Sequence, residues 1–338
     1  MSDRPIKKKS GCLKFFLFAI VIVLAMPLIW LSINYRPLTA AGKPLVKVST
    51  ETTRITEPLD ENGDVDYLEA LNIRLSAGFT PENNAAVLYA RAFGSCTVDE
   101  ESFTRYLNRL GIDGSLIYDN PLIDFDEWIY RKEREPQIDN STHPSTSEDA
   151  LEQYRYLMDD AAPWSSDQFP IVDEWLKEYR DVAETIRDAT KRERCYFPLV
   201  ARSYPQVMSA LLPHPQKMRH AARYFSISAL RQLHTNEFEK FIADLQCMER
   251  IAQHVAQGPT TVEELISIAI KRMILARIIA ACDLELETDD LQRLLAFTKT
   301  IEPLDDLVSR IDNCERFMVL DAAVSSVSYT HLTLPTKA

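Results

Sequence analysis

The spacing of apolar residues in the second half of the chain restricts the fold most. Across residues 170–192 these residues recur every three or four positions and form one stripe: Val172, Trp175, Leu176, Tyr179, Val182, Ala183 and Ile186. This spacing is the period of an amphipathic α-helix, and packing against a core explains it. From Ala150 onward nearly every segment shows such a pattern. The sequence therefore predicts a mainly α fold built as an α-solenoid-like array of helices.

Capping residues and breakers indicate where the helices begin and end. Thr80-Pro81-Glu82 is typical of a helix start, Gly78 and Gly94 of helix ends, and Thr260 to Glu264 contains two overlapping capping boxes. One short strand is expected at 46–55, which is rich in Val and Thr. The expected helices are 67–75, 80–94, 99–110, 170–192, 216–233, 237–256, 261–281, 289–300 and 304–320.

Composition excludes some classes of protein. The chain has only 8 glycines in 338 residues, which argues against glycine-rich phosphate loops and turn-rich β folds. Its net charge of −12 repels phosphate backbones, so nucleic-acid binding is not expected. The same charge gives no attraction to anionic lipid.

An uncharged apolar run near the start predicts a membrane anchor. Residues 15–33 form this run, and the basic segment 1–14 precedes it. Its length of about 28 Å as a helix is close to the hydrocarbon thickness of a bilayer. The positive-inside rule places 1–14 in the cytoplasm and the rest of the chain outside the cytoplasmic membrane. A cleaved signal peptide is the alternative, although its apolar region is usually shorter.

The remaining chain divides by composition into four expected regions. Residues 34–135 form an N-terminal helical part, 136–148 a polar loop or linker, and 149–326 a C-terminal helical array. Residues 327–338 resemble translated adapter sequence from a transposon end, so we expect a non-native tail and a helical array that is cut short. A short native β-strand is the alternative for this tail.

No motif predicts catalytic residues, a cofactor or a metal site. HExxH, GxSxG, P-loop and GxGxxG patterns are missing from the sequence, and no CxxC occurs. The carboxylates that follow Asp60 do not fit a calcium loop, and a turn that caps the next helix is favoured. Cys247 and Cys282 are expected in the core. We interpret the histidines as surface or core residues: His143, His214, His220, His234 and His254. The acid pairs are interpreted as helix starts, and their carboxylates could serve acid–base chemistry only if they are buried: Glu263/Glu264, Asp289/Asp290 and Asp305/Asp306.

Two stretches resemble an uncharacterised membrane-anchored helical family that is frequent in planctomycete-type bacteria. The first runs from Thr56-Glu57-Pro58-Leu59 through Asp66-Tyr67 and Ala70-Leu71-Asn72 to Thr80-Pro81-Glu82-Asn83-Asn84-Ala85-Ala86. The second is Arg250-Ile251-Ala252 with Ala256-Gln257-Gly258-Pro259-Thr260 and Ala269-Ile270. This resemblance implies an anchored helical domain in a bacterial cell envelope, and it implies no activity.

The sequence thus favours a single-pass anchored protein whose extracytoplasmic helical domain binds a protein or another envelope component, or acts as a scaffold. An envelope hydrolase with carboxylate acid and base in a helical cleft is the first alternative. A structural subunit of a membrane complex is the second.

Overall fold

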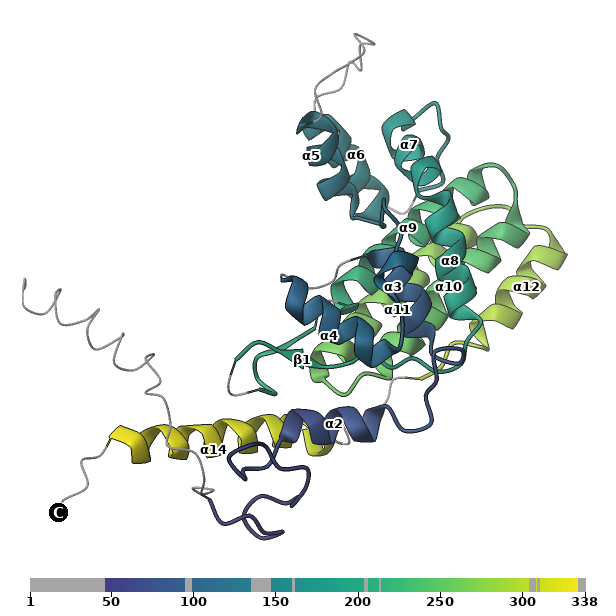
Figure 1. Ribbon diagram of the computed structural model, residues 1–338. Coiled ribbons are helices and arrows are strands. Elements are labelled where there is room, and N and C mark those ends of the chain that lie inside the picture. Colours follow the sequence, from purple (N-terminus) through teal and green to yellow (C-terminus); the bar gives the residue numbers. More distant parts are fainter. Residues whose placement is uncertain are drawn as a thin grey trace, which may run out of the picture. The chain divides into compact units, whose positions relative to one another are not determined.

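The computed structural model describes residues 46–94, 99–134, 147–159, 162–203, 206–212, 214–303, 308 and 311–333. The chain divides into two compact units, one made of residues 1–65 with 324–338 and the other of residues 66–323. The second unit contains almost all of the helices in Figure 1.

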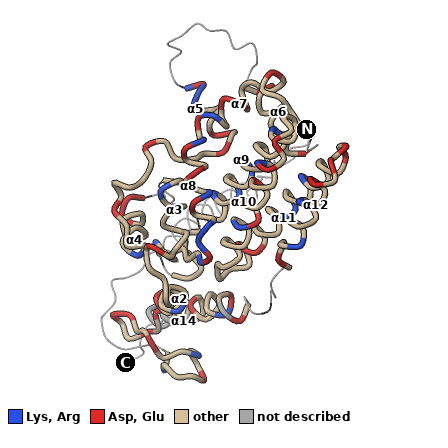
Figure 2. Tube along the Cα trace, turned by 90° about the vertical axis from the view of Figure 1, so that its right-hand side faces the viewer, with Lys and Arg blue, Asp and Glu red and all other residues tan. Residues whose placement is uncertain are grey.

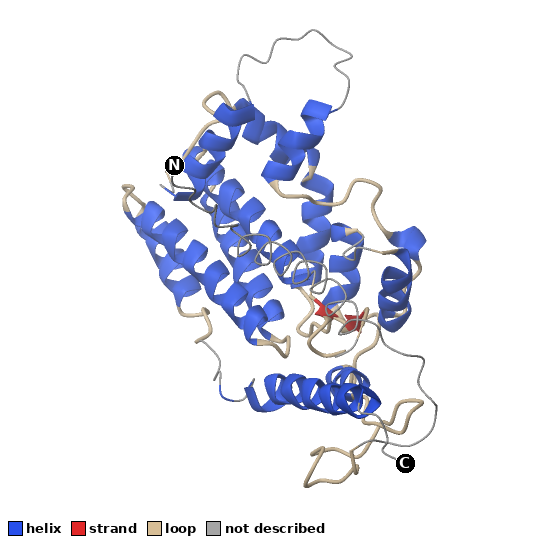
Figure 3. Cartoon of the chain, turned by 90° about the vertical axis from the view of Figure 1, so that its left-hand side faces the viewer, coloured by secondary structure: helices blue, strands red, loops and turns tan. Residues whose placement is uncertain are grey.

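The described fold is mainly α, as predicted (Figure 3). Its helices are α2 (Tyr67–Leu75), α3 (Ala85–Phe93), α4 (Glu100–Leu110), α5 (Phe125–Arg134), α6 (Ser147–Asp159), α7 (Pro170–Glu178), α8 (Arg180–Thr190), α9 (His214–His234), α10 (Phe238–Ala256), α11 (Thr261–Cys282), α12 (Thr288–Thr298) and α14 (Arg316–Thr333). A 3₁₀ turn (η1, Gly114–Leu116) follows α4, and a π-helical turn (η2, Ile311–Glu315) precedes α14. Strands β1 (Val200–Ala201) and β2 (Ala210–Leu211) pair antiparallel, with Val200 opposite Leu211.

Several helices begin at the predicted caps. The Asp66 carboxylate accepts a hydrogen bond from Glu69 N at the start of α2, and the Asp99 carboxylate accepts one from Ser102 N at the start of α4. Of the two capping boxes predicted at the start of α11, Thr260 and Glu263 form one, while the Thr261 hydroxyl donates to Glu315 at 2.8 Å. Because such a cap satisfies backbone N–H groups within one turn, short-range sequence identifies it.

Three helix predictions are wrong in their boundaries. Of the helix expected at 304–320, residues 311–315 form η2, and α14 begins only at Arg316 and continues to Thr333. The helix expected from Thr80 begins at Ala85, because Thr80 N donates to the Asn83 side chain in a preceding turn and Asn84 is the cap. The helix expected across 170–192 is two helices, α7 and α8. Tyr179 separates them with φ −96° and ψ 14°, and its side chain is fully buried.

The strand predicted at 46–55 is also wrong, since these residues form turns and bends. The Thr53 hydroxyl donates to Ser49 O at 2.9 Å, and Thr52 N donates to the Ser49 hydroxyl. Side-chain hydroxyls thus provide local partners that compete with a strand ladder. The short strand pair forms at 200–201 and 210–211 instead.

Some predictions fall on residues that the structure does not describe. The basic segment 1–14, the anchor 15–33 and residues 136–146 of the linker lie outside the described ranges, as do most of 304–310.

Ser147 and Glu148, predicted as linker, already belong to α6. Residues 327–333 of the expected tail are helical, so the alternative of a strand is wrong there. None of the described helices combines the length and the apolar character that crossing a membrane requires.

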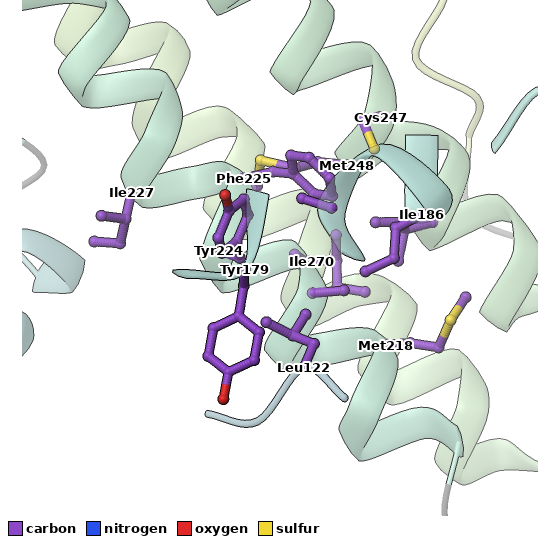
Figure 4. Packing of buried hydrophobic residues seen from close by; sticks show 14 of the residues in the cluster. Leu122, Tyr179, Ile186, Met218, Tyr224, Phe225, Ile227, Cys247, Met248 and Ile270 are labelled. Carbon is purple, nitrogen blue, oxygen red and sulfur yellow. The ribbon is translucent and has the colours of Figure 1, made fainter. Parts of the chain in front are cut away.

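The core lies where α9, α10 and α11 pack against one another and α8 packs on α10. Figure 4 shows Ile186 of α8, Phe225 of α9, Met248 of α10 and Ile270 of α11 in this region, and each is fully buried. Burying a side chain of this size contributes roughly 2 kcal/mol to the free energy of unfolding. The amphipathic stripes predicted from sequence are therefore the core-facing sides of these helices.

Candidate functional site

Two buried asparagines hold an extended segment between α8 and β1, which we call the clasped segment (residues 192–199). The Asn72 amide donates to Leu199 O at 2.9 Å, and its oxygen accepts from Leu199 N at 2.9 Å and the Tyr196 hydroxyl at 2.8 Å. The Asn84 amide donates to Tyr196 O at 2.9 Å, and its oxygen accepts from Tyr196 N at 2.9 Å. Each amide therefore replaces a strand partner for the backbone of this segment.

Charged and polar side chains fix the other end of the clasped segment. Arg192 donates to Pro81 O at 2.8 Å, and Arg194 donates to Gly78 O at 3.0 Å. The Gln257 oxygen accepts from Cys195 N at 2.7 Å, and its amide donates to Glu193 O at 3.0 Å. The segment is thus bound to the α2–α3 region on one side and to the end of α10 on the other.

His254 belongs to the same buried network. Its Nε2 donates to Arg192 O at 2.7 Å, so Nδ1 is the acceptor for the Tyr89 hydroxyl at 2.9 Å. Burial lowers the pKa of His254 to about 4, and the nearby Arg250 charge acts in the same direction. This histidine is therefore neutral and fully bonded, as the sequence analysis predicted for a core histidine.

A second histidine forms a buried pair with Glu263 at the start of α11. His214 Nε2 lies 2.6 Å from Glu263 Oε1, and the two side chains are 2% and 1% exposed. Glu263 Oε2 accepts from both Thr260 N and the Thr260 hydroxyl at 2.8 Å. The Phe197 ring stacks on the imidazole with centroids 4.0 Å apart. The pair joins the first turns of α9 and α11.

Gly258 makes room for this carboxylate. A Cβ atom at Gly258 would lie 1.9 Å from Glu263 Oε1 and 2.0 Å from its Cδ, so only glycine fits beside the bound glutamate.

The structure brings together residues from both stretches that carry the family resemblance. Asn72 and Asn84 come from the first stretch, and Gln257, Gly258 and Thr260 from the second. All of them bind the clasped segment or support the His214–Glu263 pair. Neither pocket described below is lined by any of these five residues, so their role here is to hold the fold together.

Four cysteines lie in the described part of the chain. Cys195, Cys247, Cys282 and Cys314 are free, and burial raises the pKa of Cys195, Cys247 and Cys314, the last to about 12. Cys247 is in the core as predicted. Cys282, the last residue of α11, is exposed, contrary to prediction.

Asp124 forms a third polar group with residues of α9. It accepts from Arg223 Nη1 at 2.6 Å and from the Tyr154 hydroxyl at 3.3 Å, and His220 Nε2 lies 3.4 Å away. Burial lowers the pKa of His220 to about 4, although Asp124 acts in the opposite direction. His234, in contrast, is exposed at the end of α9.

Arg277 of α11 is a fully buried cation. Its Nε donates to the Ser226 hydroxyl at 2.7 Å, and Nη2 donates to Leu157 O at 3.1 Å. Burial lowers the pKa of this guanidinium to about 10, so it remains charged near neutral pH.

Two surface pockets lie on either side of Arg187 and Ala243, which line both. The first, which we call the cationic pocket, has a volume of about 440 Å³, and the second about 500 Å³. The cationic pocket is lined by Leu176, Lys177, Arg180, Ala183, Glu184, Arg187, Tyr224, Ser228, Arg231, Gln232, Lys240 and Ala243. Sequence reasoning missed it because its cations come from four helices.

The predicted acid pairs do not form a catalytic pair of carboxylates in either pocket. Glu263 and Glu264 are both buried at the start of α11, yet neither lines a pocket. Asp289 and Asp290 lie in the first turn of α12 as predicted, while Asp305 and Asp306 fall outside the described residues. Among the pocket-lining acids, Glu249 is the buried one, and burial raises its pKa.

Within the ranges given above, no group of three His, Cys, Asp or Glu side chains is arranged to hold a metal ion. No protein-family model, curated protein or solved structure matches this chain.

Proposed function

We propose that the chain is a protein-binding domain held at the cytoplasmic membrane, and that the outer side of α11 is its binding surface. This surface, the α11 face, consists of Leu265, Arg272, Leu275 and Ile279. Leu265, Leu275 and Ile279 are 60%, 53% and 62% exposed. A row of large exposed aliphatic side chains is typical of a surface that binds a partner.

The partner that fits this face is an amphipathic helix. The four residues share one side of α11, because their spacing follows the helical period. From Leu265 to Ile279 the row spans 14 helical steps of 1.5 Å, which is about 21 Å. The opposite side of α11 packs on α9 and α10, and α12 packs on α10. A helix placed along the α11 face would continue the array with the packing that α9, α10 and α11 already use.

Charge favours a different protein over a second copy of this chain. Arg272 is the charged member of the face and lies midway between Leu265 and Ile279. Pairing two copies symmetrically along this row would place both Arg272 side chains together, and like charges in an interface are unfavourable. We infer that the partner helix carries Asp or Glu within an apolar row.

The location is part of the same proposal. The uncharged run 15–33 behind the basic segment 1–14 supports a single-pass anchor with the helical domain outside the cytoplasm. The resemblance to the planctomycete-type family supports an envelope protein and an α-solenoid-like array. The hydrolase alternative lacks support in the described residues, since neither pocket contains two buried carboxylates.

Site-specific photocrosslinking tests this surface in the full chain in cell membranes. A benzophenone amino acid at position 279 should crosslink to one protein, through a peptide with an acidic residue in an apolar helical row. Arg272→Glu in the same chain should abolish the product, because it reverses the charge that the partner contacts. The matched control is the same amino acid at Leu116, which is 48% exposed in η1.

Three outcomes would contradict the proposal. One is a crosslink to lipid alone, the second is a crosslink to another copy of this chain, and the third is a product that survives Arg272→Glu. Circular dichroism of each variant checks that the helix content of the protein is retained.

A further inference from the structure

The cationic pocket concentrates positive charge in an acidic protein. Its lining includes five cations and one acid, Glu184, although the whole chain has 50 acidic and 38 basic residues. The cations come from different helices, as Lys177 belongs to α7, Arg180 and Arg187 to α8, Arg231 to α9 and Lys240 to α10. The basic residues of α8 appear in blue in Figure 2.

Internal ion pairs neutralise only part of this charge. Lys177 and Arg231 share one carboxylate, Asp173, at 2.6 and 2.9 Å. Arg187 forms ion pairs with both Asp244 and Glu184, and Lys240 forms one with Glu237. Arg180 makes no ion pair with any described residue, and it is exposed at the mouth of the pocket.

The floor of the pocket strengthens the attraction for an anion. Tyr224 and Ala183 are buried there, and the Tyr224 hydroxyl donates to Leu176 O at 2.7 Å, inside the protein. Charges above such an apolar floor are less screened than charges in open water.

We propose that the cationic pocket binds a small molecule through a multiply charged phosphate group. Its volume of about 440 Å³ is in the range of small-molecule sites. A tetrahedral phosphate accepts hydrogen bonds from several directions, as donors on four helices require, whereas a carboxylate accepts them in one plane. This inference concerns another surface than the α11 face, so either proposal can fail alone.

The second pocket extends the positive surface past Arg187. Lys191 and Arg250 line it, together with the acids Glu249 and Glu302. With Arg187 included, the second pocket has three cations and two acids, so it is the weaker site for an anion. We therefore place the phosphate in the cationic pocket, which contains Arg180.

Isothermal titration of the full chain in detergent micelles with pyrophosphate tests the proposal. At constant ionic strength the unaltered chain should show saturable binding, and Arg180→Ala with Lys240→Ala should weaken it at least tenfold. Both side chains are exposed, so the core does not depend on them. Arg180→Lys with Lys240→Arg, which keeps both charges, should bind within about threefold of the unaltered chain.

The matched control removes two exposed cations elsewhere, by Arg134→Ala with Lys299→Ala, and should leave pyrophosphate binding unchanged. Malonate serves as the carboxylate probe and should bind at least tenfold more weakly than pyrophosphate. The proposal is wrong if pyrophosphate gives no saturable heat, if the alanine pair binds as the unaltered chain does, or if malonate binds equally well.

Discussion

At the scale of single residues, the contact between Gly258 and Glu263 controls a large share of the buried polar network. The Glu263 carboxylate lies against the Gly258 backbone, bonds His214 and caps α11 through Thr260. These interactions depend on one position of one side chain. A small change beside it therefore acts on two helix starts at once.

Gly258→Ala should destabilise the protein by about 2–3 kcal/mol. The new methyl group would overlap the carboxylate, so Glu263 would have to leave His214 and the cap. Urea unfolding followed by tryptophan fluorescence measures this change. Gly114→Ala is the matched control, since a Cβ there meets Leu107 at 3.4 Å, an ordinary contact. Equal unfolding midpoints for the two variants would contradict the argument.

At the scale of elements, the clasped segment connects helices that do not otherwise share a ladder. Asn72 of α2 and Asn84 before α3 bind its backbone, and Gln257 after α10 binds it from the other side. An amide can both donate and accept, so it satisfies an extended backbone as a neighbouring strand would. The segment therefore stays ordered without belonging to a sheet.

Asn72→Leu should destabilise the protein by about 3 kcal/mol, although the leucine side chain has the same number and branching of non-hydrogen atoms. The substitution leaves Leu199 N, Leu199 O and the Tyr196 hydroxyl without their partner. Amide hydrogen exchange at Leu199 should accelerate along with the loss of stability. Asn108→Ala, at an exposed position of α4, should change neither quantity. Unchanged exchange at Leu199 in Asn72→Leu would show that the clasp is not needed.

Short-range patterns predicted the elements better than their junctions. The caps at Asp66, Asp99 and Thr260 were predictable because a cap and its partner lie within three residues. The break at Tyr179 was not, because the apolar period continues through it and no Gly or Pro marks the junction between α7 and α8.

The candidate sites were less predictable than the helices. His214 and Glu263 are 49 residues apart, and their partnership leaves no local pattern. The same holds for the cationic pocket, whose lining is assembled from four helices. Sequence reasoning identified His214 only as a surface or core residue, and it gave no reason to group Arg180 with Arg231 or Lys240.

At the scale of the whole molecule, buried histidines make stability depend on pH. His254 and His220 both have a pKa of about 4 in the folded protein, against 6.5 for an exposed histidine. Below pH 6.5 these two histidines become protonated in the unfolded chain, whereas in the folded protein they stay neutral until the pH approaches 4. Each histidine therefore contributes its full stability above pH 6.5 and loses it as the pH falls towards 4.

His254→Gln should remove one of these two contributions. Glutamine keeps one donor and one acceptor, so it can replace the bonds to Arg192 O and Tyr89. Between pH 6.5 and 4 the unaltered chain should lose about 3 kcal/mol more unfolding free energy than the variant. Buried acids with a raised pKa, such as Asp244 and Glu249, oppose this trend in both proteins and cancel in the comparison. Parallel stability curves for the two proteins over this pH range would contradict the assignment.

The clasped segment also sets an order of events during synthesis. The hydrogen bonds of Asn72 to Leu199 connect positions 127 residues apart, and those of Asn84 to Tyr196 connect positions 112 apart. At 5–20 residues per second, about 6–25 s pass between the emergence of the first asparagine and that of its partner. Until then the nascent α2 and α3 present amides with nothing to bind, so a chaperone that shields them would act on an early, unfinished form of this chain.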